Sequence, residues 1–156
     1  MICEVPVLDR CAFFDHFQPK HLEKLTALAS VVRFSKDQVI FGEEDDDTQF
    51  YVLLSGRVAL EFGCAGRQVL IDTLHAGDEL GWSALLGQKK QFRARALEAV
   101  EASAFEVADL RRAFDANPYF ARTFLERLSD VIAQRLQNTR RQLGRSLADA
   151  RGPIAS

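Results

Sequence analysis

The chain has 156 residues, of which 47% are hydrophobic and 27% charged, and its formal net charge is −2. This composition predicts one ordinary domain with a single core and leaves no room for a second. No apolar run of roughly 18 residues or more occurs, and the first residues, MICEVPVLDR, lack the basic start and apolar stretch of an export signal. We therefore expect a cytoplasmic protein without a membrane segment.

The three cysteines are odd in number and widely spaced, at Cys3, Cys11 and Cys64. This pattern argues against a disulfide framework and against zinc or cluster ligation of the CxxC type. Buried, reduced thiols are the simplest interpretation, and no metal site is expected from them.

The charge is unevenly divided along the chain. Residues 1–118 hold 13 basic and 19 acidic residues, whereas the part from Tyr119 onward holds 7 basic and 3 acidic ones. The arginines of this last part are spread around a predicted helix with few aromatic residues between them, so a solvated or self-pairing face is favoured over a nucleic-acid surface.

The first predicted element is an amphipathic helix of about three turns within residues 19–32, and Pro19 suits its first turn. Its apolar residues follow at spacings of three and four: Leu22, Leu25, Leu28 and Ala29. From residue 31 to 105 the apolar period changes to two, and turn signals such as Ser55-Gly56 and Ala76-Gly77-Asp78 separate the runs. Short strands at this spacing predict an antiparallel sandwich or barrel.

Helical periodicity returns at residues 107–118, where Asp109 is the expected cap and Pro118 ends or restarts the helix. A longer helix is predicted from about Tyr119 to Leu147, and Gly152-Pro153 is expected to stop it. Along it an apolar stripe follows steps of four and three: Leu128, Ile132, Leu136, Leu143 and Leu147. Because Phe120, Phe124 and Val131 lie on a neighbouring face, one face can meet the strands and the other a second copy. A homodimer through Leu128, Ile132, Leu136 and Leu143 is the prediction.

The densest functional signal is the segment AGDELGWSALLGQKKQFRARA. It predicts a strand exit, a glycine turn, one short helical turn, a basic loop and another strand, which is the layout of a phosphate-binding cassette. The short helix after Gly81 would leave unpaired backbone donors at Trp82, Ser83, Ala84 and Leu85. Lys89, Lys90 and Arg93 would supply cations. A plain loop with a solvated lysine pair is the alternative, and spacing alone does not separate the two.

Three segments together resemble the cyclic-nucleotide-binding domains of the catabolite activator (Crp/Fnr-like) family. They are GEEDDDTQFYVLLSGRVALEF with its turn glycines Gly42 and Gly56, GDELGWSALL, and RLSDVIAQRLQNTRRQLG. The resemblance covers nearly the whole chain. It implies a mainly β fold, an antiparallel β-roll (a double-stranded β-helix or jelly roll), with an N-terminal helix and a long C-terminal dimerisation helix. Residues 1–118 would form the roll and its helix, and residues 119–156 the dimerisation helix and tail.

The resemblance also implies roles for cassette residues, and two of them depart from the pattern. In responsive members a Glu after the cassette glycine binds the ribose 2′-hydroxyl, and a later Arg clamps the cyclic phosphate. Those places read Trp82 and Lys90. An indole cannot accept the ribose hydrogen, and an ammonium lacks the bidentate fork of a guanidinium. Losing two such bonds, at about 1.5–3 kcal/mol each, would weaken cAMP binding by about a hundredfold or more.

Two positions on the long helix, Arg135 and Thr139, match those that reach the purine of a bound nucleotide in the family. Each candidate also has a plainer structural interpretation. Thr139 could be a polar seam residue, Ser83 a helix cap in place of a phosphate donor, and Trp82 a core residue in place of a platform for the base. The predicted ligand-binding set is therefore Gly81, Trp82, Ser83, Ala84, Leu85, Lys89, Lys90, Arg93, Arg135 and Thr139.

Two functions compete at this stage. In the first, a cyclic nucleotide, cAMP or another, or a different anionic small molecule binds the cassette, and the long helix closes on it and signals to an unidentified protein partner. In the second, the chain is a ligand-independent dimerisation or protein-interaction module that no longer binds cAMP.

Catalysis and specific DNA binding are not expected. The sequence has no usable spacing of nucleophile, base and orienting residue, and the acidic run 43–47 looks like a solvated turn and not a metal site. No covalently bound cofactor is expected. In family transcription factors a helix-turn-helix follows the long helix, and this sequence ends at Ser156 without one.

Overall fold

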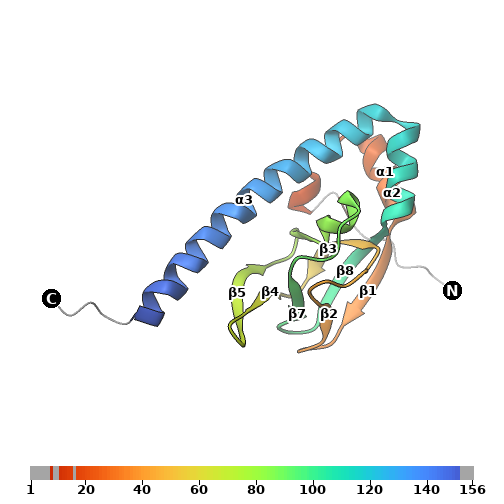
Figure 1. Ribbon diagram of the computed structural model, residues 1–156. Helices are drawn as coiled ribbons and strands as arrows, with labels where there is room; N and C mark the ends of the chain where they lie inside the picture. Colours follow the sequence, from red (N-terminus) through yellow and green to blue (C-terminus); the bar gives the residue numbers. More distant parts are fainter. Residues whose placement is uncertain (1–7, 9–10, 16, 152–156) are drawn as a thin grey trace.

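The computed structural model describes residues 8, 11–15 and 17–151, with short strands in the middle of the chain and helices at both ends (Figure 1). The first elements are η2 (Ala12–Phe14), α1 (Pro19–Leu28), β1 (Ser30–Phe34), β2 (Val39–Phe41), β3 (Gln49–Ser55), β4 (Val58–Cys64) and β5 (Arg67–Leu74). The chain continues through β6 (Glu79–Leu80), η3 (Trp82–Leu86), β7 (Arg93–Ala96), β8 (Val100–Glu106), α2 (Val107–Ala116) and α3 (Pro118–Arg151).

The strands form two four-stranded antiparallel sheets, in the orders β1-β8-β3-β6 and β2-β7-β4-β5. This confirms the predicted antiparallel β-roll with helices at both ends. The period of two explains the packing, because Ala94 and Ala96 are fully buried while Arg93 and Arg95 on the same strand are only partly covered. The inside of the roll is apolar, and its buried residues include Phe41, Tyr51, Leu53, Leu60, Ile71, Leu74 and Leu80.

A second apolar cluster joins the outer face of the first sheet to the helices. It is rich in phenylalanine: Phe13, Phe14, Phe17, Phe50, Phe105, Phe120 and Phe124. The rings of Phe124 and Phe50 lie 5.6 Å apart between centroids, which links α3 to β3. Phe120, Phe124 and Leu128 recur every four residues, so one face of α3 contributes all three to this cluster.

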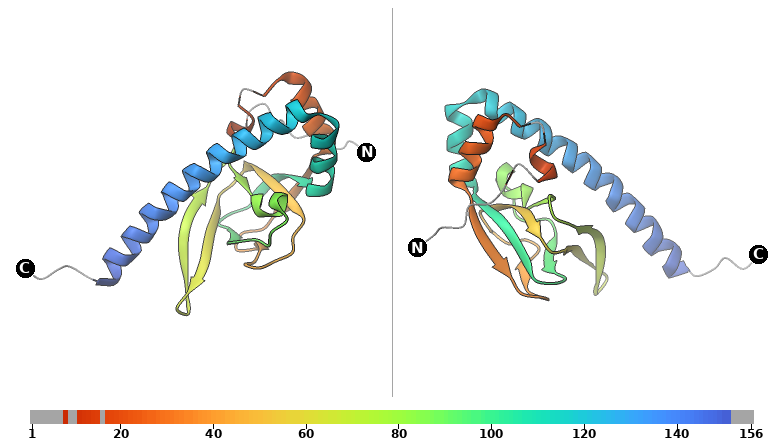
Figure 2. Two further views of the ribbon diagram at one scale, coloured as in Figure 1. Left: turned by 45° about the horizontal axis from the view of Figure 1, so that its top comes forward. Right: turned by 180° about the vertical axis from the view of Figure 1, so that it is seen from behind.

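The long helix α3 crosses the β-roll and continues past β5, as the three views agree (Figure 2). It contacts α2 near its start and β5 further along. Gly144 does not interrupt it, and a side chain at that position would meet nothing within 4 Å. The side of α3 at Gly144 therefore faces open space.

Several boundaries differ from those expected. The first helix ends at Leu28, because Ala29 takes an extended conformation and β1 begins at Ser30. Glu106, and not Asp109, precedes the first turn of α2, and Asp109 lies inside that turn as an ion-pair partner of Arg112. The expected stop at Gly152-Pro153 lies outside the described residues.

The cysteine prediction holds for one thiol and fails for another. Cys11 is buried, whereas Cys64 is exposed at the end of β4, where the hairpin turn begins. Cys3 lies outside the described residues. Within the described chain, no helix has the length and apolar character needed to cross a membrane.

Candidate ligand-binding cassette

The glycine turn of the cassette is a steric requirement of the fold. Gly81 has a φ of +88° and directly precedes η3. A Cβ at this position would lie 2.6 Å from the Lys90 ammonium nitrogen and 2.9 Å from the carbonyl oxygen of Gln49. Only glycine fits both the backbone conformation and the space.

Some backbone groups of the short helix η3, which follows this turn, form hydrogen bonds within the cassette itself. The amide of Ala84 donates to the Gly81 carbonyl at 3.3 Å, so this predicted free donor is partnered. The Ser83 carbonyl accepts from Gln88 at 3.0 Å. Ser83, Ala84 and Leu85 are buried, and Trp82 is partly buried against the phenylalanine cluster.

Lys90 points into the roll. Its side chain is almost completely buried, and its ammonium donates to the carbonyl oxygens of Gln49 at 2.7 Å and Gly81 at 3.2 Å. The same nitrogen lies 4.6 Å from the centroid of the Phe41 ring. Burial lowers the pKa of Lys90 to about 8, against the opposing pull of nearby carboxylates such as Asp47. This cation thus ties the cassette turn to β3.

The other two cassette cations lie elsewhere. Lys89 is exposed, and with Ala84 of η3 it lines a groove of about 550 Å³ that Val107 and Arg111 of α2 also line, here called the η3–α2 groove. Arg93 donates to the Glu61 carboxylate at 3.0 Å, and Arg95 donates to the same oxygen at 3.1 Å. Burial alone would raise the pKa of Glu61, but the two arginines outweigh it and hold that pKa below its usual value.

On α3, Arg135 forms a buried ion pair that the sequence did not reveal. Its Nη2 lies 2.7 Å from the Glu79 carboxylate and donates to the Glu79 backbone carbonyl at 3.0 Å. Burial raises the pKa of Glu79, and the charge of Arg135 opposes that rise. Glu79 neighbours Leu80, which faces the roll interior, so strand alternation was the signal for its opposite orientation. Thr139 donates to the carbonyl of Arg135 within the helix, at 2.9 Å.

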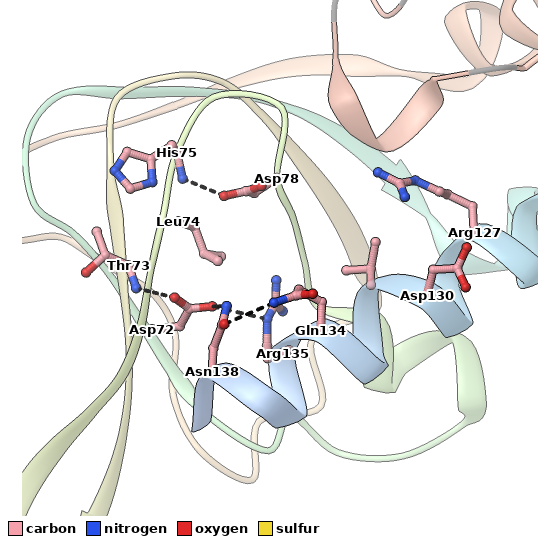
Figure 3. A pocket seen from close by; sticks show the side chains of 11 residues that line it. Asp72, Thr73, Leu74, His75, Asp78, Arg127, Asp130, Gln134, Arg135 and Asn138 are labelled. Atoms are coloured by element: carbon pink, nitrogen blue, oxygen red, sulfur yellow. Dashed lines mark hydrogen bonds and ion pairs between the residues drawn. The ribbon is translucent and has the colours of Figure 1, made fainter. Parts of the chain in front are cut away.

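A groove of about 500 Å³ separates α3 from the end of β5 (Figure 3). Its lining includes Asp72, Asp78, Asp130, Arg135 and Asn138. Asn138 donates to Asp72 at 3.1 Å, across the groove floor between helix and strand. The structure thus places the predicted residues in different parts of the molecule: Arg135 lines this groove, Ala84 and Lys89 line the η3–α2 groove, and Lys90 faces the roll interior. Among the described residues, no group of His, Cys, Asp or Glu side chains could hold a metal ion.

A family model for the cyclic nucleotide-binding domain matches residues 31–117, which is the span from β1 to the end of α2. The chain belongs to the cyclic nucleotide-binding domain family. This confirms the resemblance found in its segments.

Curated relatives of this chain are regulatory proteins by name. This chain is 28% identical over 151 residues to the nitrogen fixation regulation protein FixK of Bradyrhizobium diazoefficiens. The match covers 94% of this chain and 60% of the relative. The chain is 29% identical over 124 residues to the cAMP-activated global transcriptional regulator CRP of Salmonella typhimurium, covering 78% of this chain and 57% of the relative. The chain therefore spans under two thirds of the length of these relatives.

Solved structures agree on the fold. A putative cyclic nucleotide-binding protein from Geobacter metallireducens superposes with a TM-score of 0.73 at 22% identity, over 83% of this chain and 95% of that one. The catabolite activator protein of Thermus thermophilus gives a TM-score of 0.70 at 21% identity, over 85% of this chain and 62% of that one. At these identities the likeness establishes a shared architecture.

Proposed function

We propose that this family member is a regulatory module with a degenerate cassette, which keeps α3 docked on the β-roll without cAMP. The observation that carries the proposal is the position of the Lys90 ammonium, bound inside the roll to the carbonyls of Gln49 and Gly81. Lys90 stands where the family resemblance places the phosphate-clamping Arg, and Trp82 stands where it places the ribose-binding Glu.

The energetic argument concerns what Lys90 would have to give up. To reach a cyclic phosphate, its ammonium would leave two carbonyl acceptors and an aromatic ring. Hydrogen bonds to charged groups contribute about 1.5–3 kcal/mol each, so releasing two would penalise binding by about 10²–10⁴-fold. New bonds to the phosphate would offset part of this penalty, but the missing ribose acceptor at Trp82 would not be replaced.

In this proposal the output of the module is α3, paired with a second copy. Leu125, Leu136 and Leu147 are 42%, 62% and 62% exposed. Leu125, Ile132 and Thr139 recur every seven residues, as do Ser129, Leu136 and Leu143, which is the repeat of a two-stranded coiled coil. Leu128, which the sequence placed in the same stripe, is buried in the chain's own core. The proposed dimer face is therefore narrower than the one first expected.

The paired helices would then present their projecting ends to a protein partner. The proposal assigns the chain no catalytic step and no covalently bound cofactor, and it places the protein in the cytoplasm. It also assigns no specific DNA contact to the residues present.

Calorimetric titration of the purified protein with cAMP, cGMP and cyclic dinucleotides tests the proposal. No heat of binding is expected for cAMP up to ~1 mM. A Kd of this size corresponds to a binding free energy of only about 4 kcal/mol. The double variant Trp82→Glu with Lys90→Arg is expected to gain measurable cAMP binding, because it restores an acceptor and a bidentate donor. Lys89→Arg, a change at the exposed neighbour, is the matched control. Micromolar cAMP binding by the unaltered protein would refute the proposal.

The second candidate function, a small-molecule sensor, is favoured by the groove between β5 and α3 (Figure 3). A ligand there would touch Arg135 and Asn138 on the output helix directly. Titration heat from any nucleotide that disappears in Asn138→Ala and survives in Lys89→Met would favour this second function over the first.

A further inference from the structure

The helix α3 is attached to the rest of the chain in two chemically different ways. Its first half is held by apolar side chains, among them Phe120, Phe124 and Leu128, each no more than 2% exposed. Further along, the attachments are polar. Arg135 reaches Glu79 on β6, and Asn138 reaches Asp72 on β5. Beyond this point the helix projects past β5 (Figure 1).

Glu79 is the least ordinary member of the polar attachment. Its side chain is 0% exposed, so its charge depends on the protein for stabilisation. The Arg135 guanidinium supplies the nearest opposite charge at 2.7 Å, and Lys90 supplies a more distant one. Asp78 and Asp72 add negative charge near the pair. A buried carboxylate in this setting fixes the position of the guanidinium, and through it the position of the helix.

The pair also joins the helix to the cassette. Glu79 lies two residues before Gly81, on the short strand β6 that leads into the cassette turn. Arg135 forms an ion pair with the Glu79 carboxylate and donates a hydrogen bond to the Glu79 backbone carbonyl, so a shift of β6 disturbs two contacts of one guanidinium at once. Lys90, bound to the Gly81 carbonyl from the roll side, holds the other flank of the same turn.

We propose that Glu79 is an internal counter-ion that holds the projecting half of α3 against the β-roll without a bound ligand, so that the Glu79–Arg135 pair is the joint through which the cassette acts on α3. This inference rests on the proposed function, and it identifies Glu79 as the residue that positions Arg135 beside the cassette. Because the first half of α3 is held by apolar contacts, opening the joint releases the projecting half alone. A buried ion pair is suited to this task, because removing either partner breaks the contact and leaves the other charge without its nearest counter-charge.

Hydrogen exchange on the full chain, followed by mass spectrometry, tests the joint. The variants are Glu79→Gln, Arg135→Met and the two combined. Each single variant is expected to speed amide exchange in residues 132–143 at least tenfold and to leave β8 within twofold. The combined variant is expected to exchange no faster than the faster single variant, because the second change removes nothing further from a pair that is already broken. Glu98→Gln, which breaks the exposed pair with Arg57, is the matched control and is expected to change nothing.

Two results would overturn the inference. One is unaltered exchange in residues 132–143 of both single variants. The other is a combined variant whose acceleration equals the product of the single effects, as independent space-filling roles would give. If Glu79→Gln does not fold, Arg135→Met and the combined variant supply the same comparison. The exchange experiment and the titration above test different claims. If the unaltered protein binds cAMP while the variants exchange as expected, the proposed function is refuted and the role of the Glu79–Arg135 pair is retained.

Discussion

At the residue scale, Lys90 keeps its charge inside an apolar roll through two carbonyl oxygens and an aromatic ring. The sequence left two interpretations open, an ammonium that faces an anion and a solvated lysine pair, and both place Lys90 outside the apolar core. Two groups outside the cassette, the Gln49 carbonyl and the Phe41 ring, hold Lys90 inward, and the missing side chain at Gly81 leaves room for its ammonium. Gln49 and Phe41 are both more than 40 residues from Lys90 in the sequence, so spacing could not have shown these contacts.

The buried ammonium makes stability depend on pH. The pKa of Lys90 is about 8 in the folded state and 10.5 when unperturbed. Between these values the unfolded chain binds more protons, so the free energy of unfolding rises with pH. At roughly 1.4 kcal/mol per pKa unit the gain is roughly 3 kcal/mol. Urea denaturation from pH 7.5 to 10.5 should show it in the unaltered protein and in Lys89→Met. Lys90→Met should lack it, and parallel curves for all three proteins would contradict the assignment.

The turn at Gly81 offers a test with an internal control. Gly81 and Gly66 both have positive φ, +88° and +77°, but a Cβ at Gly66 would meet nothing within 4 Å. Both alanine variants carry the backbone strain of about 1 kcal/mol, and Gly81→Ala adds a clash with Lys90 and the Gln49 carbonyl. Chemical denaturation should therefore show that Gly81→Ala lowers the free energy of unfolding by about 1–3 kcal/mol more than Gly66→Ala does. Equal losses would show that the cassette turn is not close-packed.

At the scale of elements, one face of α3 packs in the chain's own core, and a neighbouring face is the one proposed to pair with a second copy. The sequence predicted both faces from apolar spacing, and it placed Phe120 and Phe124 against the strands as the structure does. It assigned Leu128 to the dimer stripe, whereas the structure buries that residue in the chain's own core. Periodicity gives the faces of a helix, and packing decides the residues at their border.

The anchoring of α3 is tested at Phe124. Its ring lies 5.1 Å from that of Phe114, 5.4 Å from Phe13 and 5.6 Å from Phe50, between centroids. Replacing a buried phenylalanine by alanine removes apolar contacts and leaves a cavity, so Phe124→Ala should lower the free energy of unfolding by about 3–5 kcal/mol. Tyr119→Ala, at a residue 72% exposed, should change it by less than about 0.5 kcal/mol. Urea denaturation compares the two; a small loss at Phe124 would contradict the anchoring role.

The proposed pairing of α3 is tested at Leu136, which is exposed, and at Ile132, which is half-buried. Ile132→Asp combined with Leu136→Asp puts two charges in the apolar seam and should give a monomer in analytical ultracentrifugation. Gln137→Asp combined with Arg141→Asp adds charge on the outer face and should leave the dimer intact. A dimer that survives the first pair of changes would remove Ile132 and Leu136 from the interface.

At the scale of the whole molecule, the architecture was predictable and the state of the cassette was not. Alternating apolar residues such as Val58 and Leu60, with turn signals between the runs, predict short antiparallel strands from local chemistry alone. Glu79 shows the limit of the sequence. It lies two residues before the cassette glycine, and nothing near it in the sequence indicates its role, because its partner Arg135 is 56 residues away. Long-range pairing decides which charges serve a ligand and which serve the fold.

The central claim, a cassette whose lysine is satisfied by the chain itself, is tested most directly by a crystal structure of the protein grown in millimolar cAMP. The account predicts a cassette without nucleotide, with the Lys90 ammonium on the carbonyls of Gln49 and Gly81 and Arg135 on Glu79. Electron density for cAMP at the turn between Gly81 and Leu85, with Lys90 or Arg135 moved onto its phosphate, would contradict it.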